Sequence, residues 1–268
     1  MSSQSNYLTI SVQREGPNGQ IARVSLKRPD VRNAFNEVVV AELTAAFAAV
    51  GQDPELRVVV LAAEGKAFCA GADLNWMKAM AGFSWEQNHA DAALLAEMLW
   101  TIYSCPVPVI ARVQGDAYAG GVGLVAVCDV VVAVETAGFC LSEAKLGLLP
   151  ATISPYVVRA LGEQASRRYF LTAERFSAAE AHRLGLVQEL ATTDNLDEKV
   201  SALAAAIAAN GPQAVRACKR LVQDVAHVPV TPSLRDDTAR RIADIRASAE
   251  GREGVQSFLN KSRPAWLA

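Results

Sequence analysis

The sequence has little of what marks metal-binding, disulfide-rich or membrane-spanning proteins. Its three histidines, His89, His182 and His227, stand far apart and lack the spacing of metal ligands, so we expect no metal site. Its five cysteines show no C-x-x-C pair and lie mostly in apolar strings, which predicts buried, reduced thiols in a cytoplasmic protein. No run of about 18 apolar residues is free of charges and turn formers, so we expect no transmembrane helix.

Net charge is also small. The 26 basic and 28 acidic residues of the 268-residue chain leave a formal charge of −2, which gives no positive field for nucleic acid or an anionic membrane. The first residues carry no basic patch followed by an apolar run, so we expect no secretory signal. With 51% hydrophobic and 20% charged residues, the composition is that of a globular protein with a substantial core.

What the chain does have is two loops built almost without side chains. Residues 68–74 (FCAGADL) follow an apolar run at 57–63, and residues 119–123 (AGGVG) follow another at 108–113. Small residues let the backbone approach a ligand closely and leave N–H groups free. Two such loops can aim two N–H donors at one oxygen, which suits an anion that forms during a reaction. Either loop alone is also explained as an ordinary glycine turn.

The first half of the chain alternates between predicted strands and helices. Residues 7–13 and 21–26 predict a strand pair around a turn at 16–19. Asn36 is placed to cap a helix. A second helix begins with a capping box at Ser84 and is predicted to run to about Tyr103. The β-branched and apolar runs predict buried strands, at 57–63, 108–113 and 129–134, with a short helix from Gly120 to Val127 between the last two.

From about residue 154 the pattern becomes helical. Ser177 to Glu180 has the form of a second capping box, with Gly185 as the stop. Further helices are predicted at 195–210, 212–225 and 232–249, the last with Thr231 before Pro232 at its start. In the first half, a turn and an aromatic residue follow each of three apolar strands, which indicates a spiral of similar strand–strand–helix units.

Residues 67–74 (AFCAGADL) and 115–129 (GDAYAGGVGLVAVCD) resemble the two signature stretches of the crotonase, or enoyl-CoA hydratase/isomerase, superfamily. The likeness extends to residues 24–34, 141–150 and 253–261. It implies an α/β fold, a crotonase-type spiral of ββα turns with a C-terminal helical appendage. Residues 1–195 are then the core that binds the CoA ester and carries catalysis. Residues 196–268 are the helical region that covers the core and forms the contacts of a homotrimer or hexamer.

The resemblance also assigns the site. It gives the oxyanion-hole donors as the backbone N–H groups of Ala72 and Gly120, and the proton carrier at the substrate α-carbon as Glu143. Apolar neighbours of Glu143 are expected to raise the pKa of its carboxyl. Asp73 is expected to order its loop or cap the next helix. Substrate binding is assigned to Asp30, Val31, Arg32, Ala34, Ala70, Ala72, Asp73, Leu74, Asn75, Gly120, Gly123, Ser142 and Glu143.

Positive charge for the phosphates of CoA is expected from Lys27, Arg28 and Arg32, with Lys261 reaching in from the tail. No cofactor is expected, since coenzyme A is part of the substrate. Residues 121–126 also fit a dinucleotide fingerprint. Only about six residues separate Gly123 from the next strand, too few for the crossover helix that such a site requires.

Gly123 departs from the two-glutamate hydratases of the family, which carry a second Glu at this position. Three readings stay open: Glu143 does both jobs in turn, another group orients the water, or the reaction is a double-bond isomerisation that needs one carboxylate. We expect the space vacated at Gly123 to accept a branch at the substrate β-carbon.

The predicted activity is that of a hydro-lyase that adds water across an α,β-unsaturated CoA thioester, in fatty acid or leucine degradation. Residues 73–77 and 139–156 resemble the methylglutaconyl-CoA and isohexenylglutaconyl-CoA hydratases of leucine and terpene breakdown. The candidates for binding the extra carboxylate of such substrates are Tyr118, Lys78, Lys145 and Ser154.

Two alternatives accompany this prediction. One is an enoyl-CoA isomerase that uses Glu143 alone. The other is a non-catalytic relative that binds acyl-CoA or RNA. The charge balance disfavours RNA, and an intact Glu143 disfavours a protein without turnover.

Overall fold

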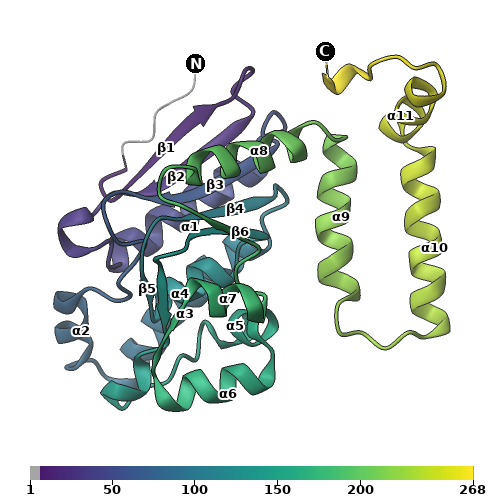
Figure 1. Cartoon of the computed structure of the whole chain (residues 1–268). Helices are drawn as coiled ribbons and strands as arrows, with labels where there is room; N and C mark the ends of the chain where they lie inside the picture. The colour runs from purple at the N-terminus through teal and green to yellow at the C-terminus, as the bar shows by residue number, and fades with distance from the viewer. Residues whose placement is uncertain (1–6, 268) are drawn as a thin grey trace.

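Two β-sheets form the frame of the molecule in the computed structural model, which describes residues 7–267 (Figure 1). The larger sheet has the strand order β1-β2-β3-β4-β6-β9, with β1 antiparallel to β2 and the other neighbours parallel. Its strands are β1 (Ile10–Glu15), β2 (Ile21–Leu26), β3 (Val58–Ala63), β4 (Val109–Val113), β6 (Val130–Val134) and β9 (Glu189–Ala191). The smaller sheet holds β5 (Ala117–Tyr118), β7 (Gly138–Cys140) and β8 (Arg175–Ser177).

The predicted hairpin of β1 and β2 is confirmed, but β1 begins at Ile10 and not at residue 7. The N–H groups of Leu8 and Thr9 donate to the carboxylate of Glu42, at 2.7 and 2.8 Å, and so are engaged by a helix side chain. The turn at 16–19 closes through a hydrogen bond from Gly19 N to Gly16 O.

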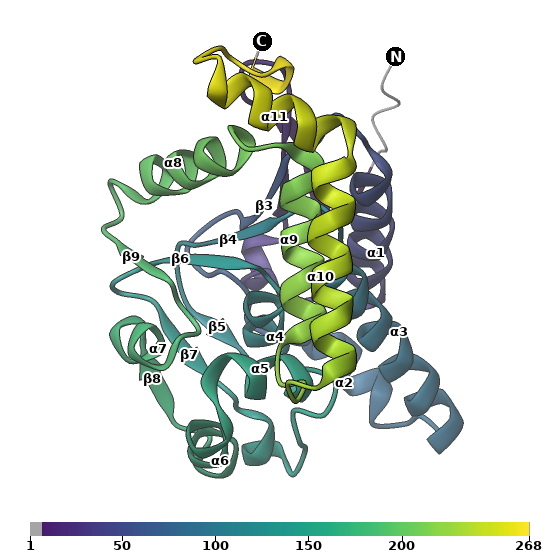
Figure 2. The same cartoon turned by 90° about the vertical axis from the view of Figure 1, so that its right-hand side faces the viewer.

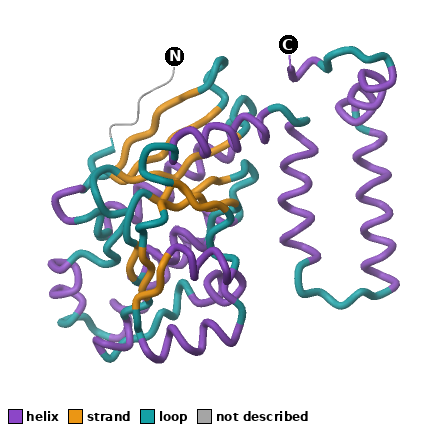
Figure 3. Tube along the Cα trace, in the orientation of Figure 1, coloured by secondary structure: helices purple, strands orange, loops and turns teal. Residues whose placement is uncertain are grey.

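Strand β3 is buried on both faces, as its continuous apolar sequence predicts. It lies between β2 and β4 in parallel register. The helix α8 (Leu196–Ala208) packs over β3, β4 and β6, and α1 (Glu37–Gln52) contacts β1, β2 and α3 (Trp85–Tyr103). The core therefore centres on this sheet (Figure 3, strands in orange).

The repeated pattern of a turn and an aromatic residue after an apolar strand corresponds to a structural repeat. After β3, β4 and β6 the chain turns and adds one short segment to a second ladder before it forms a helix. Cys69 bridges Ala117, Ala117 pairs with Phe139, and Phe139 pairs with Phe176. Each turn of the chain thus covers the open edge of the previous one, as the spiral prediction requires.

Most of the predicted helix starts are confirmed by their caps. Asn36 accepts from Val39 N at 3.2 Å, and Ser84 and Gln87 form a reciprocal capping box. Helices of the first two-thirds of the chain are α1, α2 (Leu74–Met80), α3, α4 (Gly120–Ala126), α5 (Ser154–Leu161), α6 (Glu163–Thr172) and α7 (Ala178–Leu184), with single 3₁₀ turns at Pro29–Val31 and Glu143–Leu146. A last 3₁₀ turn spans Ala265–Leu267.

Of the two hydrogen bonds predicted for the second capping box, only the one accepted by Ser177 forms. Ser177 caps α7 by accepting from Glu180 N at 3.2 Å, and Gly185 ends the helix at φ 94°. The Glu180 carboxylate does not return to Ser177. It is bound by the Arg183 guanidinium at 2.7 Å and by the Tyr169 hydroxyl at 3.2 Å, because a charged partner holds it more strongly than a backbone N–H.

The C-terminal part consists of α9 (Pro212–Val225), α10 (Pro232–Ala247) and α11 (Ala249–Leu259). In Figure 2, α9 and α10 run alongside each other, and an ion pair of 2.7 Å joins Arg241 to Asp224 between them. The predicted helix at 232–249 ends at Ala247, because Ser248 is extended and caps α11 by accepting from Gly251 N. Within residues 7–267, none of the helices is long and apolar enough to cross a membrane.

Polar side chains of α9 attach it to the core. Lys219, only 6% exposed, donates to Asp129 at 2.7 Å at the start of β6. Arg216 donates to the carbonyls of residues 53 and 56, and Gln223 to the carbonyl of Tyr103. Burial raises the pKa of Asp129, and the Lys219 ammonium opposes that rise.

Lys219→Met should lower the free energy of unfolding by about 1–3 kcal/mol, because it removes the charged hydrogen-bond partner of the Asp129 carboxylate, whose side chain is only 29% exposed. Urea unfolding at a fixed protein concentration measures the change. Lys78→Met, at an exposed position of α2, is the control and should change stability by less than about 0.5 kcal/mol. Equal effects of the two substitutions would contradict an anchoring role for Lys219.

Candidate active site

The two glycine-rich loops lie against each other. Tyr118 N donates to Cys69 O at 2.9 Å. A Cβ built on Gly121 would lie 2.5 Å from Cys69 O, and one on Gly71 would lie 3.0 Å from Tyr118 O. Backbone therefore packs directly on backbone, and both positions exclude a side chain. The two loops that stand out in the sequence are therefore in direct contact.

Each loop presents a backbone N–H without an internal acceptor. Gly71 O and Asp73 N both bond to Phe35, so the N–H of Ala72 between them points the other way. Among the hydrogen bonds of residues 7–267, none uses the N–H of Ala72 or of Gly120. Both residues are partly exposed, and neither of the two donors is used within the fold.

Ala119 directs the second donor. Its backbone has φ 48° and ψ −121°, a conformation that an alanine rarely adopts. Its N–H donates to Cys140 O at 2.7 Å and its carbonyl accepts from Val122 N at 2.9 Å, which hold it in place. The resulting sharp turn starts α4 at Gly120 and leaves the Gly120 N–H outside the helical hydrogen bonds.

Phe35 connects the two loops, and sequence reasoning missed it. Its backbone pairs with the loop of Ala72, while its ring tip overlaps the place where a Cβ of Gly120 would stand. The ring is buried and lies 6.2 Å from that of Trp76. The only signal of it in the sequence is that Phe35 is the one aromatic residue in the mostly polar stretch 27–37.

Asp73 orders its loop and caps the next helix, as predicted. It accepts from Asn75 N at 2.8 Å and from Arg28 Nη2 at 2.8 Å. The hydrogen bond from Asn75 N lowers the pKa of the Asp73 carboxyl, burial opposes this, and Arg28 lowers it further. Arg28 also donates to the carbonyl of Ala34, so two of its guanidinium nitrogens are engaged within the protein.

Asn33 holds the same segment from inside. It is 1% exposed, has a left-handed backbone (φ 55°), and donates to the carbonyls of Glu64 and Ala67 at 2.7 and 2.9 Å. Its side-chain oxygen accepts from Arg28 N. The segment 28–35 is thereby fixed against the loop that carries Ala72.

Glu143 begins a 3₁₀ turn directly after Ser142, and one oxygen of its carboxyl is buried without a hydrogen-bond partner. Burial raises the pKa of Glu143, and the hydrogen bond from its own backbone N–H opposes the rise only in part. No charged side chain within residues 7–267 contributes to this shift. The carboxyl is thus poised to hold and release a proton nearer neutrality than an ordinary glutamate.

A cavity of about 720 Å³ adjoins the first loop, and three of the predicted binding residues line it: Asp30, Arg32 and Ala70. Lys66, Gln114, Asp116 and Tyr118 supply further polar groups at its walls. The volume is that of a typical small-molecule site. The remaining predicted binding residues do not line this cavity: Val31, Ala34, Ala72, Asp73, Leu74, Asn75, Gly120, Gly123, Ser142 and Glu143.

The surroundings of those other residues differ. Ala34 is buried, and Leu74 is 74% exposed at the start of α2. Asn75 is exposed beside it, and Val31 is exposed on the 3₁₀ turn Pro29–Val31.

The expectation of empty space at Gly123 is wrong. Gly123 is buried, and a Cβ there would overlap the Cγ2 of Ile153 and lie 2.8 Å from its Cβ. Leu99 follows at 3.7 Å. The side chain of Ile153, which directly precedes α5, therefore fills the volume that a side chain at position 123 would occupy.

Comparison with known proteins is consistent with this architecture. Residues 16–268 match the family described as Enoyl-CoA hydratase/isomerase. The chain belongs to the enoyl-CoA hydratase/isomerase family, the crotonase superfamily. The enoyl-CoA hydratase ACTT6 of Alternaria alternata is 34% identical over 252 residues, which cover 91% of this chain and 80% of that protein.

Solved structures agree with the assignment. The crystal structure of an enoyl-CoA hydratase from Shewanella pealeana superimposes with a TM-score of 0.94 at 40% identity, covering 98% of this chain and 97% of that one. An enoyl-CoA hydratase from Mycobacterium smegmatis gives a TM-score of 0.91 at 34% identity, with 97% and 100% covered. The chain is thus an enzyme of the enoyl-CoA hydratase family, and an acyl-CoA thioester substrate is consistent with it.

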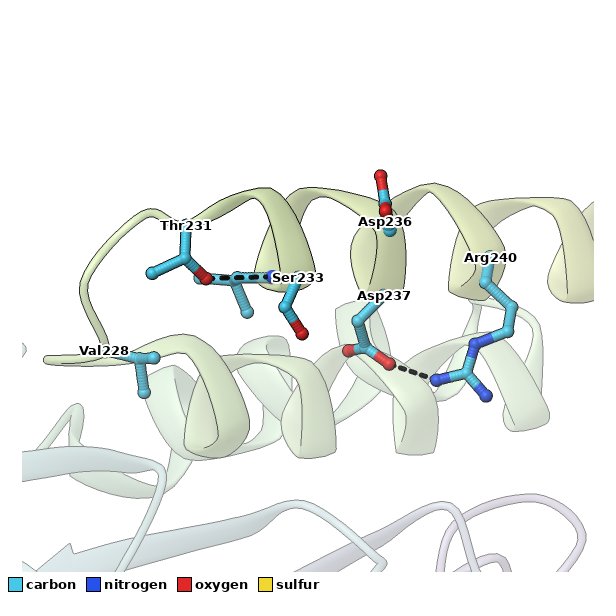
Figure 4. Close-up of a pocket in the computed structure, with 7 residues that line it drawn as sticks. Val228, Thr231, Ser233, Asp236, Asp237 and Arg240 are labelled. Carbon is cyan, nitrogen blue, oxygen red and sulfur yellow. Dashed lines mark hydrogen bonds and ion pairs between the residues drawn. The ribbon is translucent and has the colours of Figure 1, made fainter.

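A second hollow, of about 600 Å³, lies at the turn between α9 and α10 and includes none of the predicted site residues (Figure 4). Its polar groups serve the helix itself: the Thr231 hydroxyl accepts from Leu234 N, and Asp237 pairs with Arg240. This hollow therefore gives no support for a substrate site between α9 and α10.

Gly120→Val should abolish turnover of enoyl-CoA substrates, because its Cβ would displace the Phe35 ring or rotate the Gly120 N–H. The loss of one oxyanion donor typically removes about 10²–10³ in kcat. Gly82→Ala is the control: a Cβ there meets only Ala79 O at 3.6 Å and should leave turnover unchanged. A soluble Gly120→Val protein with wild-type kcat would show that the second loop has only a structural role.

Proposed function

We propose that this enzyme adds water across the double bond of an α,β-unsaturated CoA thioester, with Glu143 as the only carboxylate at the reacting atoms. One observation carries the proposal. Two backbone N–H groups without internal acceptors, on Ala72 and Gly120, belong to loops in direct contact, and Glu143 supplies a buried carboxyl oxygen without a partner.

In the proposed reaction, the thioester oxygen accepts hydrogen bonds from the N–H groups of Ala72 and Gly120. Ionised Glu143 takes a proton from water as the water oxygen bonds to the β-carbon. The π electrons move toward the thioester, and the two donors stabilise the charge on its oxygen, each by roughly 3–4 kcal/mol. Protonated Glu143 then gives its proton to the α-carbon, so atoms and charge balance.

For the acyl group, we propose a 3-branched glutaconyl-CoA. Support comes from the likeness of residues 73–77 and 139–156 to the hydratases of such esters. Lys145 and Lys78 are exposed and form no ion pair within residues 7–267, so both cations are available to a substrate carboxylate. Ser154 is less suited, because its hydroxyl donates to Ala151 O at 2.8 Å.

A second candidate is isomerisation of the enoyl double bond. The contact between Gly123 and Ile153 favours it, because Ile153 fills the place where a second carboxylate would have to stand. One carboxylate suffices for isomerisation, since the same group removes a proton from one carbon and returns it to another.

A panel of enoyl-CoA thioesters distinguishes the two. The panel comprises crotonyl-CoA, 3-methylcrotonyl-CoA, 3-methylglutaconyl-CoA and a 3-enoyl-CoA, each analysed by mass spectrometry after incubation. Hydration adds the mass of one water, whereas isomerisation keeps the mass and changes the absorbance of the conjugated thioester. Unchanged esters across the whole panel would contradict both activities.

Glu143→Gln should bind CoA esters almost as the wild type does but lose nearly all turnover, by about 10²–10⁴ in kcat. The amide keeps the shape of the carboxyl and cannot carry the proton. Titration calorimetry with a saturated acyl-CoA and a hydration assay measure the two effects. Turnover above a tenth of the wild-type rate would exclude Glu143 as the proton carrier.

The same substitution should raise thermal stability at pH 7–8 but not at pH 4. The folded protein raises the pKa of Glu143, so the native state holds its proton more tightly than the unfolded chain. Stability is therefore lost as pH rises through the folded-state pKa, and a neutral amide avoids that loss. Melting temperatures of both proteins at the two pH values give the comparison. The same difference in Tm at both pH values would contradict the assigned direction.

We also propose a homotrimer or hexamer. None of the apolar residues of α9 or α10 is buried in the single chain, and α11 exposes Val255, Phe258 and Leu259. Phe258 alone is 83% exposed. Such an apolar surface is typical of a contact between subunits.

Light scattering at micromolar concentration should therefore report the mass of three or six chains. Phe258→Glu should shift the protein toward smaller species, because it places a charge in the apolar contact. Lys261→Glu, nearby and exposed, is the control. A monomeric wild type would contradict the assembly.

A further inference from the structure

The contact between α4 and the segment before α5 joins a position without a side chain to one with a large side chain. Gly123 is buried, and Ile153, 1% exposed, occupies the volume directly beyond its Cα. The Ile153 Cβ lies 2.8 Å from the place of a Gly123 Cβ, closer than real Cβ atoms approach. The two positions therefore share one volume, and only one of them can carry a side chain into it.

This shared volume lies next to the proposed oxyanion donor. Gly120 and Gly123 are three residues apart on α4, so they lie on the same face and about 4.5 Å apart along its axis. Phe35 covers that face at Gly120, and Ile153 covers it at Gly123. In an enoyl thioester the β-carbon lies two bonds from the carbonyl carbon, so a thioester held at the Gly120 N–H brings its β-carbon near this face.

We propose that Ile153 is a specificity-determining residue, whose side chain, packed on Gly123, forms the apolar wall that limits the group on the β-carbon of the substrate. This proposal rests on the proposed function. The wall offers neither a proton acceptor nor a donor, so substrates are selected there by size and apolar contact.

Neighbouring residues limit how the wall can respond. Leu99 of α3 stands 3.7 Å from the place of a Gly123 Cβ, and Val157, one turn further along α5, is fully buried. Shortening Ile153 therefore opens a confined space, not a channel to solvent. Added methyl groups of a substrate can occupy such a space, and one methylene typically changes kcat/KM by about 10-fold or more.

The experiment compares Ile153→Ala with Val157→Ala, a matched removal of apolar side chain from the same helix region. For each, kcat/KM is measured for crotonyl-CoA and for a 3-branched enoyl-CoA. Ile153→Ala should raise the ratio of branched to unbranched ester by about 10-fold or more. Val157→Ala should lower stability but leave the ratio unchanged. An unchanged ratio in a folded Ile153→Ala protein overturns the proposal.

Reciprocal substitution tests the shared volume. Gly123→Ala should lower kcat/KM for crotonyl-CoA by about 10-fold, and Gly123→Ala combined with Ile153→Ala should recover most of that loss. Absence of recovery in a folded double variant overturns the shared volume. If Ile153→Ala does not fold, Ile153→Val replaces it and should shift the substrate ratio in the same direction by at least about 2-fold.

Failure of the proposed function is recognised separately. If the wild type hydrates crotonyl-CoA but the ratio does not move in Ile153 variants, the activity stands and the Ile153 proposal is wrong. If the wild type turns over no ester, the activity is wrong, and calorimetric Kd values for butyryl-CoA and 3,3-dimethylbutyryl-CoA decide the Ile153 proposal. The ratio of these Kd values should then move about 10-fold in Ile153→Ala, and an unchanged ratio overturns it.

Discussion

The structure depends on one close contact, that of backbone on backbone between the loops at 68–74 and 119–123. Gly71 and Gly121 leave no room for a side chain, and the hydrogen bond from Tyr118 to Cys69 fixes the separation of the two loops. Everything nearby maintains this contact. Phe35 fills the gap beside Gly120, Arg28 and Asp73 brace one loop, and the strained Ala119 turns the other. A site made of N–H groups is only as accurate as the packing that holds its backbone.

Much of this could be read from the sequence, for reasons that are local. Continuous β-branched and apolar residues predict buried strands, as in β3. Capping residues such as Asn36 and Ser84 predict where helices begin. The two loops are visible because glycine and alanine cluster after apolar strands. A titratable residue in an apolar stretch, Glu143, is visible in the same way.

Two of the misses are contacts between segments that lie far apart in the sequence. Nothing in the sequence near Gly123 says that Ile153 fills its volume, since the two residues are joined only by the packing of α4 and α5. Phe35 was missed for the same reason. The half-formed capping box at Ser177 failed because Glu180 found a charged partner in Arg183, a competition that spacing alone does not reveal. The two-residue β5 and the three-residue β8 and β9 are too short to carry a periodic signal.

The attachment of α9 has a consequence for how the molecule opens. Lys219, Arg216 and Gln223 fasten this helix by hydrogen bonds to one carboxylate and to backbone carbonyls, while the sheets are held by a continuous apolar core. Hydrogen bonds between α9 and the core can be replaced by hydrogen bonds to water, whereas the buried apolar contacts of the sheets are lost only when the core unfolds. We therefore expect the helices from α9 onward to open locally at a lower free energy than the spiral does. We expect the amide hydrogens of α9 and α10 to exchange through openings that leave those of β3 and β4 protected, which would give the chain two levels of protection within one fold.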